Sequence, residues 1–161
     1  MPLTLDLPTL LGNITTIAGT ITGIRHAYSY DDVPQRPPGV PNAGNAYHVT
    51  MLPGTDGTTV RYDAVGLDLM QYVVEVPLYT IVASEKNIDR ASTWIGPYFG
   101  RYPEMFRTKM QLNGAITSGL ASFEQPAHIV RRIPDWSGYD GFYMIRWVLT
   151  CHIKGSAINS P

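Results

Sequence analysis

The sequence predicts an α+β fold: an antiparallel-rich twisted sheet with long hairpins, packed on one face by an N-terminal helix and a kinked central helix. Three observations predict this class. Apolar residues recur with a helical period near the N-terminus, they alternate with a period of two over several later segments, and the alternation over residues 143–153 is unbroken. No repeat, linker or low-complexity tract divides the 161 residues, so we expect one domain over residues 1–161.

The first predicted element is an amphipathic helix with Asp6 as its N-cap. Its apolar residues have the spacing of one helix face: Leu7, Leu10, Leu11, Ile14, Ile17, Ala18 and Ile21. Gly12, Gly19 and a threonine-rich opposite face lower the intrinsic helix propensity. We therefore expect this helix to depend on docking against the sheet.

A proline-rich segment follows the first predicted strand, residues 23–30. Residues 31–42 hold four prolines within eight positions, which cannot supply N–H groups to a strand ladder, so the segment must leave the sheet. Val33 and Val40 suggest that it packs on something. Its charged residues are Asp31, Asp32 and Arg36. We interpret the segment as a stiff projecting arm that grips a neighbour; the alternative is a crossover that lies over its own sheet.

Further alternation predicts three more strand features. After Asn45 the odd positions turn inward, namely Tyr47, Val49 and Met51. Residues 54–57 form a predicted hairpin loop that leads into a strand over residues 58–65. A long strand follows over residues 69–84, in which Pro77 predicts an edge, a bulge or a bend because a central strand would lose a hydrogen bond there.

A second helical segment is expected to begin near Asn87. The residues on its apolar stripe are Ile88, Ala91, Ile95, Tyr98, Phe99 and Tyr102. Gly96 and Pro97 predict a kink or a split, and Pro103 is positioned to restart a short helix that extends to Met110. A turn is expected beyond it, at Asn113 and Gly114.

The last third of the chain predicts a long C-terminal hairpin over residues 127–154, with its turn around residues 134–138. The second strand carries an apolar face that we expect to contact the helices: Tyr143, Ile145, Trp147, Leu149, Cys151 and Ile153. The turn region gathers two guanidinium groups and two amphipathic rings within nine residues: Arg131, Arg132, Trp136 and Tyr139. Such a set is typical of interaction hot spots, and packing of Trp136 beneath the hairpin is an equally good interpretation.

Composition points to a subunit surrounded by partners. Only 16% of the residues are charged, so much of the surface must be neutral and partly apolar. The formal net charge of −1 provides no basic face for a phosphate backbone, which argues against a nucleic-acid partner. The lone Cys151 excludes an internal disulfide and fits a reducing compartment. No Lys or Arg precedes Arg25, and polar residues interrupt the apolar positions, so we expect neither a signal peptide nor a membrane span.

No spacing in the sequence predicts catalysis. The four histidines are scattered over four predicted strands: His26, His48, His128 and His152. Motifs of nucleophilic hydrolases, nucleotide-binding loops and zinc proteases are absent from the sequence. Adjacent aspartates in loops are turn residues more often than acid–base pairs. We therefore expect a protein that is not an enzyme, with no catalytic, cofactor-binding or metal-binding residues.

Two motifs in the second half carry a family resemblance. Residues 106–116 and the later residues 139–143, which open the long apolar strand, resemble the tail terminator (tail completion) proteins of long-tailed bacteriophages. The order of the earlier elements is similar to that family as well. It comprises an N-terminal helix, a strand that starts at Gly23 and Ile24, a proline-bearing loop, and an aromatic-led strand at Tyr47.

The resemblance implies a structural virion protein. Such a subunit assembles as a six-fold ring on the last ring of the tail tube, ends tube growth and presents the tail to the connector of the head. Its implied partners are further copies of itself, the tail tube protein and the head–tail connector or neck proteins, with no membrane. Its implied location is the tail or neck of the virion, and the host cytoplasm during assembly.

A ring requires two distinct interaction surfaces, because one patch of a subunit meets a different patch of the next. The candidates are the arm at 31–42 and the hairpin turn at 131–141. Two other functions stay open: a head-completion or neck adaptor on the portal side, and a small-ligand-binding or enzymatic α+β domain, which would show a deep pocket lined by polar groups.

Overall fold

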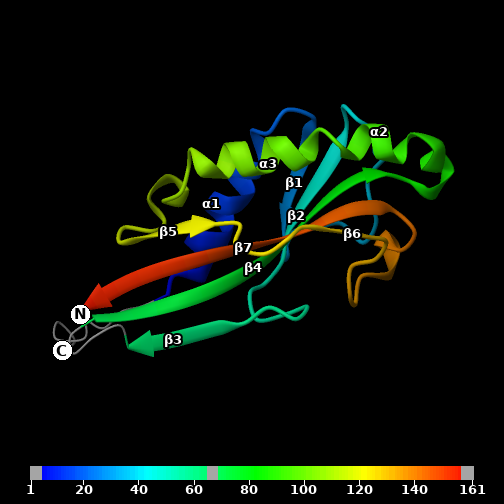
Figure 1. Cartoon of the computed structure of the whole chain (residues 1–161). Helices are drawn as coiled ribbons and strands as arrows, with labels where there is room; N and C mark the ends of the chain where they lie inside the picture. The colour runs from blue at the N-terminus through cyan, green and yellow to red at the C-terminus, as the bar shows by residue number, and fades with distance from the viewer. Residues whose placement is uncertain (1–4, 65–68, 157–161) are drawn as a thin grey trace.

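The structure is a computed structural model that describes residues 5–64 and 69–156. Its helices and strands are α1 (Leu7–Gly19), β1 (Ile24–Ser29), β2 (Ala46–Thr50), β3 (Val60–Ala64), β4 (Leu69–Ala83), α2 (Ala91–Ile95), α3 (Tyr98–Arg107), β5 (Gly119–Ser122), β6 (His128–Val130) and β7 (Tyr143–Ser156). Short 3-10 turns occur at Glu85–Arg90, Leu112–Gly114 and Ser137–Tyr139. The strands form one seven-stranded mixed sheet, which with the helices confirms the predicted α+β class. Figure 1 shows α2 and α3 running along one side of this sheet.

Two long antiparallel strands form the spine of the sheet. β4 and β7 pair from Leu69 opposite Ser156 to Ala83 opposite Tyr143. β2 and β3 lie end to end along the free side of β4, and β6 and β5 lie end to end along the free side of β7. β1 extends the sheet beyond β2 by parallel pairing. The predicted C-terminal hairpin is therefore present as β6 and β7, whereas β5 was not predicted.

The residues between β2 and β3 do not form the predicted hairpin loop. A hairpin would pair these two strands with each other, but both pair with β4, β2 at residues 78–81 and β3 at residues 70–74. The segment 51–59 is instead an excursion in the middle of one side of β4. The predicted strand 58–65 is β3, shortened to Val60–Ala64, and its last residue, Val65, lies outside the described residues.

This interruption explains how a proline fits inside a central strand. The carbonyl oxygen of Pro77 accepts a hydrogen bond from the backbone N–H of Met51 at 2.9 Å. Since the N–H and C=O groups of one strand residue point to the same side, the missing N–H of Pro77 faces the interruption between β2 and β3. The loss of a ladder hydrogen bond, which the sequence predicted, is thus placed where no strand continues.

The helices cover one face of the sheet and form the larger core. The side chain of Asp6 accepts a hydrogen bond from the N–H of Thr9 at 3.2 Å, which confirms the predicted N-cap of α1. The predicted inward face of β7 is also confirmed, since it packs in this core together with α1 and α3: Tyr143, Ile145, Trp147, Leu149, Cys151 and Ile153. The Trp147 ring stacks on Tyr102 of α3 with a centroid distance of 5.0 Å.

The central helical segment is split as predicted, but its buried stripe differs. α2 ends at Ile95 and α3 begins at Tyr98. Pro103 does not restart a helix, because it lies inside α3. Ile88 and Phe99, which were predicted on the stripe, are 65% and 41% exposed. The buried residues keep one helical spacing across the split: Ala91, Ile95, Tyr98, Tyr102 and Phe106. Ile88 falls outside this stripe because it lies in the 3-10 turn before α2, and Phe99 lies beside the stripe.

A histidine lies in the middle of the larger core. His48 of β2 is fully buried, with its Nδ1 atom 2.7 Å from the Tyr102 hydroxyl and its Nε2 atom 2.7 Å from Oγ1 of Thr50. Burial lowers the pKa of His48 to about 3, so the ring is neutral near pH 7; it makes these hydrogen bonds and stacks on Tyr102. β2 is thus buried on both faces, and the alternation predicted only its inward odd positions.

Candidate interaction face

The face of the sheet opposite the helices carries a second, smaller core. It consists of Tyr47, Val49, Met51, Tyr79, Ile81, Ile133, Tyr139 and Met144, with Val33, Val130, Trp136 and Phe142 packed against it. Two connecting segments supply the outer layer of this core, the proline-rich segment 31–42 and the turn 131–141. Both segments proposed from the sequence as interaction surfaces therefore lie on one face.

The proline-rich segment lies over its own sheet and does not project from it. β1 and β2 are parallel neighbours, so the chain must cross back before β2 can begin in the same direction. Val33 packs against the smaller core, whereas Val40 is 61% exposed. The structure therefore favours the crossover that the sequence left as the alternative to an arm.

The turn holds this crossover in place by two close contacts. The hydroxyl of Tyr139 donates a hydrogen bond to the carbonyl oxygen of Pro34 at 2.8 Å. Gly138 lies directly against the backbone of Gln35, since a Cβ atom at Gly138 would stand 1.8 Å from the carbonyl oxygen of Gln35. Tyr139 is 1% exposed, so its role in the single chain is internal packing.

The charged residues of the crossover divide into two groups. The Asp32 carboxylate accepts a hydrogen bond from the N–H of Ser29 at 2.8 Å and closes the turn after β1. Asp31 and Arg36 are exposed, and neither has a hydrogen bond or ion pair within the described part of the chain.

The turn does not bring its two arginines together. Arg131 donates to the carbonyl oxygen of Gly141 at 2.8 Å, and its guanidinium group lies 4.4 Å from the ring centroid of Tyr143. It also lies 3.7 Å from the carboxylate of Glu85. Arg132 is exposed and makes no hydrogen bond or ion pair with any residue that the structure describes. Arg131 is thus engaged within the chain, and Arg132 is available to a partner.

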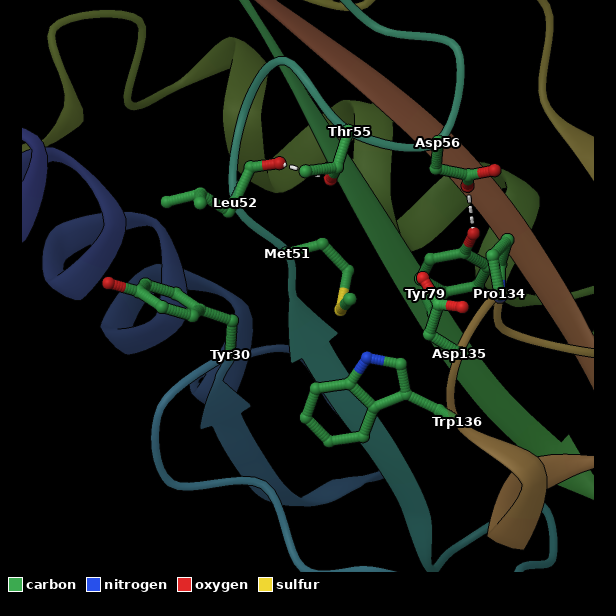
Figure 2. A pocket seen from close by; sticks show the side chains of 9 residues that line it. All are labelled: Tyr30, Met51, Leu52, Thr55, Asp56, Tyr79, Pro134, Asp135 and Trp136. Atoms are coloured by element: carbon green, nitrogen blue, oxygen red, sulfur yellow. Dashed lines mark hydrogen bonds between the residues drawn. The ribbon is translucent and has the colours of Figure 1, made fainter.

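A pocket of about 180 Å³ opens between the loop after β2 and the turn. Its lining residues are Tyr30, Met51, Leu52, Thr55, Asp56, Tyr79, Pro134, Asp135 and Trp136. Figure 2 shows Tyr30 and Trp136 on two sides of the pocket and the Met51 side chain between them. Trp136 is half-buried and packs edge to face against Tyr139 at a centroid distance of 6.4 Å. Most of the Trp136 side chain is therefore packed within the chain, as in the alternative interpretation of packing beneath the hairpin.

A partly buried ion pair closes one end of this pocket. Asp56 accepts hydrogen bonds from Nε of Arg146 at 2.8 Å and from the hydroxyl of Tyr79, as Figure 2 shows for the latter. Burial and the neighbouring carboxylate raise the pKa of Tyr79, so its hydroxyl stays protonated and donates. The side chains of Arg146 and Asp56 are 18% and 21% exposed. The pair fixes the loop after β2 to β7.

Two short strands have exposed apolar side chains at an open edge. β3 pairs with β4 alone among the described strands, and Val60 and Tyr62 are 43% and 49% exposed. β6 pairs with β7 alone, and its Ile129 is 56% exposed. β5 differs, because the N–H of Ala121 donates to the carbonyl oxygen of Met110 at 2.7 Å.

Within residues 5–64 and 69–156, no three His, Cys, Asp or Glu side chains gather in a way that could hold a metal ion. Burial raises the pKa of Cys151 to about 12, which makes its thiol a poor nucleophile near neutral pH. In the same part of the chain, every helix is too short or too polar to cross a membrane.

Sequence reasoning missed the ion pair and the open edges. Asp56 and Arg146 are 90 positions apart, and no local pattern joins them. The sequence did contain a signal for the open edge at Val60 and Tyr62, since these large apolar residues alternate with Arg61 in a predicted strand. Comparison with known proteins adds no relative, because no protein-family model and no curated protein matches this sequence.

Proposed function

We propose that the chain is a structural virion protein of a long-tailed bacteriophage, a tail terminator. In this role it caps the tail tube as a ring, ends tube polymerisation and forms the surface that joins the head connector. The resemblance of residues 106–116 and 139–143 to that family supports the proposal. The low content of charged residues supports it as well, since a neutral surface suits a subunit that is surrounded by partners.

The observation that carries the proposal is the presence of two different open strand edges on opposite sides of the β4–β7 spine. A ring of identical subunits needs two unlike, complementary surfaces on each subunit. β3 and β6 are unlike in sequence, lie on opposite sides of the spine and expose large apolar side chains. They therefore supply the two surfaces that head-to-tail assembly requires.

The proposal is tested in the phage that encodes the chain. Without the protein, tails should grow to uncontrolled lengths and remain unjoined to heads. Purified protein added to isolated tail tubes should form a ring at one end, visible by electron microscopy, and should restore joining. A neck adaptor would bind isolated heads and leave isolated tubes bare. Tails of normal length in the absence of the protein would contradict a terminator role.

A further inference from the structure

We propose that adjacent copies of this chain join by strand addition, with β3 of one copy pairing antiparallel to β6 of the next and Tyr62 lying opposite Ile129. This inference deepens the proposed function and rests on it for the closure of the copies into a ring. The pairing itself follows from the backbone, the exposed side chains and the charges of the two strands.

Both edges have unpaired backbone groups. β3 and β6 each have one neighbouring strand among the described residues, so alternate N–H and C=O groups point away from the sheet. No further backbone hydrogen bond reaches residues 60–64 or 128–130 within the described part of the chain. β5 cannot serve in the same way, because Met110 occupies its outer side. Open edges of this kind bind an added strand through main-chain hydrogen bonds.

The strand directions permit a head-to-tail contact. β3 is antiparallel to β4, β4 to β7, and β7 to β6, so β3 and β6 of one chain run in opposite directions. β3 and β6 lie at opposite ends of the spine, so the next copy must be shifted along the strands to bring its edge beside the first. With its helices on the same side, β3 and β6 then meet antiparallel. Each copy then leaves one β3 edge and one β6 edge for its neighbours, as a ring requires.

The exposed apolar side chains lie on matching faces. Val60 and Tyr62 are opposite Val74 and Tyr72 of β4, on the face that the helices cover. Ile129 is opposite Ile145 of β7, which is on the same face. Pairing the two strands would place these three exposed side chains against one another. Cross-strand pairs of aromatic and β-branched residues stabilise antiparallel sheets.

Charge selects the register. The Asp63 carboxylate accepts a hydrogen bond from Nε of Arg61 at 3.0 Å. With Tyr62 opposite Ile129, this carboxylate lies opposite His128 on the other face of the sheet, where a ring N–H can donate to it. A shift by two residues would place Arg61, which has no acceptor, opposite His128 in place of the carboxylate. In the favoured register Arg132 falls opposite Thr59, whose N–H donates to the carboxylate of Glu75 at 2.8 Å.

Engineered cysteines test this pairing, because the native Cys151 is buried. Asp63→Cys and His128→Cys chains are mixed and oxidised under two conditions. In one the chains are free in solution at high concentration, and in the other they are bound to isolated tail tubes. Opposite residues in antiparallel strands are close enough for a disulfide. We expect cross-linked dimers from the mixture and at least tenfold fewer from a matched mixture of Arg61→Cys and His128→Cys. Dimers from Asp63→Cys alone would show that two β3 strands pair with each other and would overturn the proposal.

A second pair of variants separates folding from assembly. Tyr62→Lys should keep the circular dichroism spectrum and melting temperature of the native chain and should abolish ring formation. Leu120→Lys, which replaces an equally exposed apolar residue on the covered β5 edge, should still form rings. Rings from Tyr62→Lys would overturn the strand pairing.

The two proposals fail in different ways. If the native chain caps tubes normally but no cross-link forms between the Asp63→Cys and His128→Cys chains under either condition, the pairing is wrong and the terminator function stands. If the cross-link forms in the mixture but tail length does not depend on the protein, the function is wrong and the pairing stands.

Discussion

Tyr139 donates its hydroxyl hydrogen bond to the carbonyl oxygen of Pro34 at 2.8 Å, and this contact joins two segments that are 105 positions apart. Burial raises the pKa of Tyr139 to about 12, so the hydroxyl is a donor over the whole neutral range. The crossover and the C-terminal turn thus form one layer. A substitution in either segment should therefore weaken the packing of the other.

Tyr139→Phe should destabilise the chain by about 1–3 kcal/mol, since the carbonyl of Pro34 would lose its partner in a largely buried place. Urea denaturation followed by circular dichroism measures this loss. Tyr30→Phe is the matched control, because Tyr30 is 40% exposed, and it should change the free energy of unfolding by less than about 0.5 kcal/mol. Equal stability of the two variants would contradict the anchoring role of Tyr139.

Gly138→Ala tests the close approach of the turn to the crossover. A Cβ atom there would lie 1.8 Å from the Gln35 carbonyl oxygen, so the backbones must separate, at a cost of about 1–3 kcal/mol or more. Gly100→Ala gives the opposite sign, since Gly100 lies in α3 with nothing within 4 Å of the added atom. Alanine in an exposed helix stabilises by about 0.5–1 kcal/mol. Thermal unfolding of both variants shows whether the signs differ.

Trp147→Ala should cost about 3–5 kcal/mol, as a core truncation does. Trp147 is 4% exposed and its Nε1 atom donates to Oγ1 of Thr80 at 3.0 Å, so the change removes both packing and a buried hydrogen bond. The free energy of unfolding from denaturant titration gives the comparison. A loss under about 1 kcal/mol would be incompatible with the position of this ring beneath α3.

The buried His48 should make the chain less stable in mild acid. Its pKa falls from 6.5 to about 3 on folding, so between these values the unfolded chain binds a proton that the folded chain does not. The free energy of unfolding therefore has its full value above about pH 6.5. It decreases progressively as the pH falls toward 3, by at most about 1.4 kcal/mol per pH unit. His48→Gln should flatten the dependence of unfolding free energy on pH between 6.5 and 4.

Periodicity predicted the elements that are buried on one face, but it could not predict which strands pair with one another. The α1 stripe with its Asp6 cap and the odd face of β7 follow directly from local spacing, and the structure confirms them. The burial of His48 was not predicted, because both faces of β2 are covered. The contrast between buried and exposed positions, on which alternation depends, is therefore absent. The partnership of β2 and β3 with β4 depends on contacts far apart in the sequence, so a local loop signal at 54–57 could only suggest the nearest partner.

The candidate site shows the same limit. Proline content correctly indicated that residues 31–42 leave the sheet, but it does not say whether such a segment projects or folds back. The contact of Tyr139 with Pro34 decides this, and it spans most of the chain. The two arginines are adjacent in sequence, yet Arg131 is engaged by Gly141, Tyr143 and Glu85 while Arg132 is not.

Separate substitution of the two arginines should therefore divide stability from assembly. Arg131→Ala removes a hydrogen bond and a cation–π contact and should lower the free energy of unfolding by about 1–2 kcal/mol. Arg132→Ala should leave the melting temperature unchanged, because no described residue contacts this side chain through a hydrogen bond or ion pair.

If Arg132 pairs with the carboxylate of Glu75 across a desolvated contact between copies, its loss should weaken ring formation on tail tubes by roughly 2–5 kcal/mol, against under about 1 kcal/mol for a solvent-exposed pair. Quantitative binding of each variant to isolated tubes gives the measurement, and Arg36→Ala, an exposed arginine away from β6, is the control. Full capping by Arg132→Ala at native affinity would remove this residue from the contact.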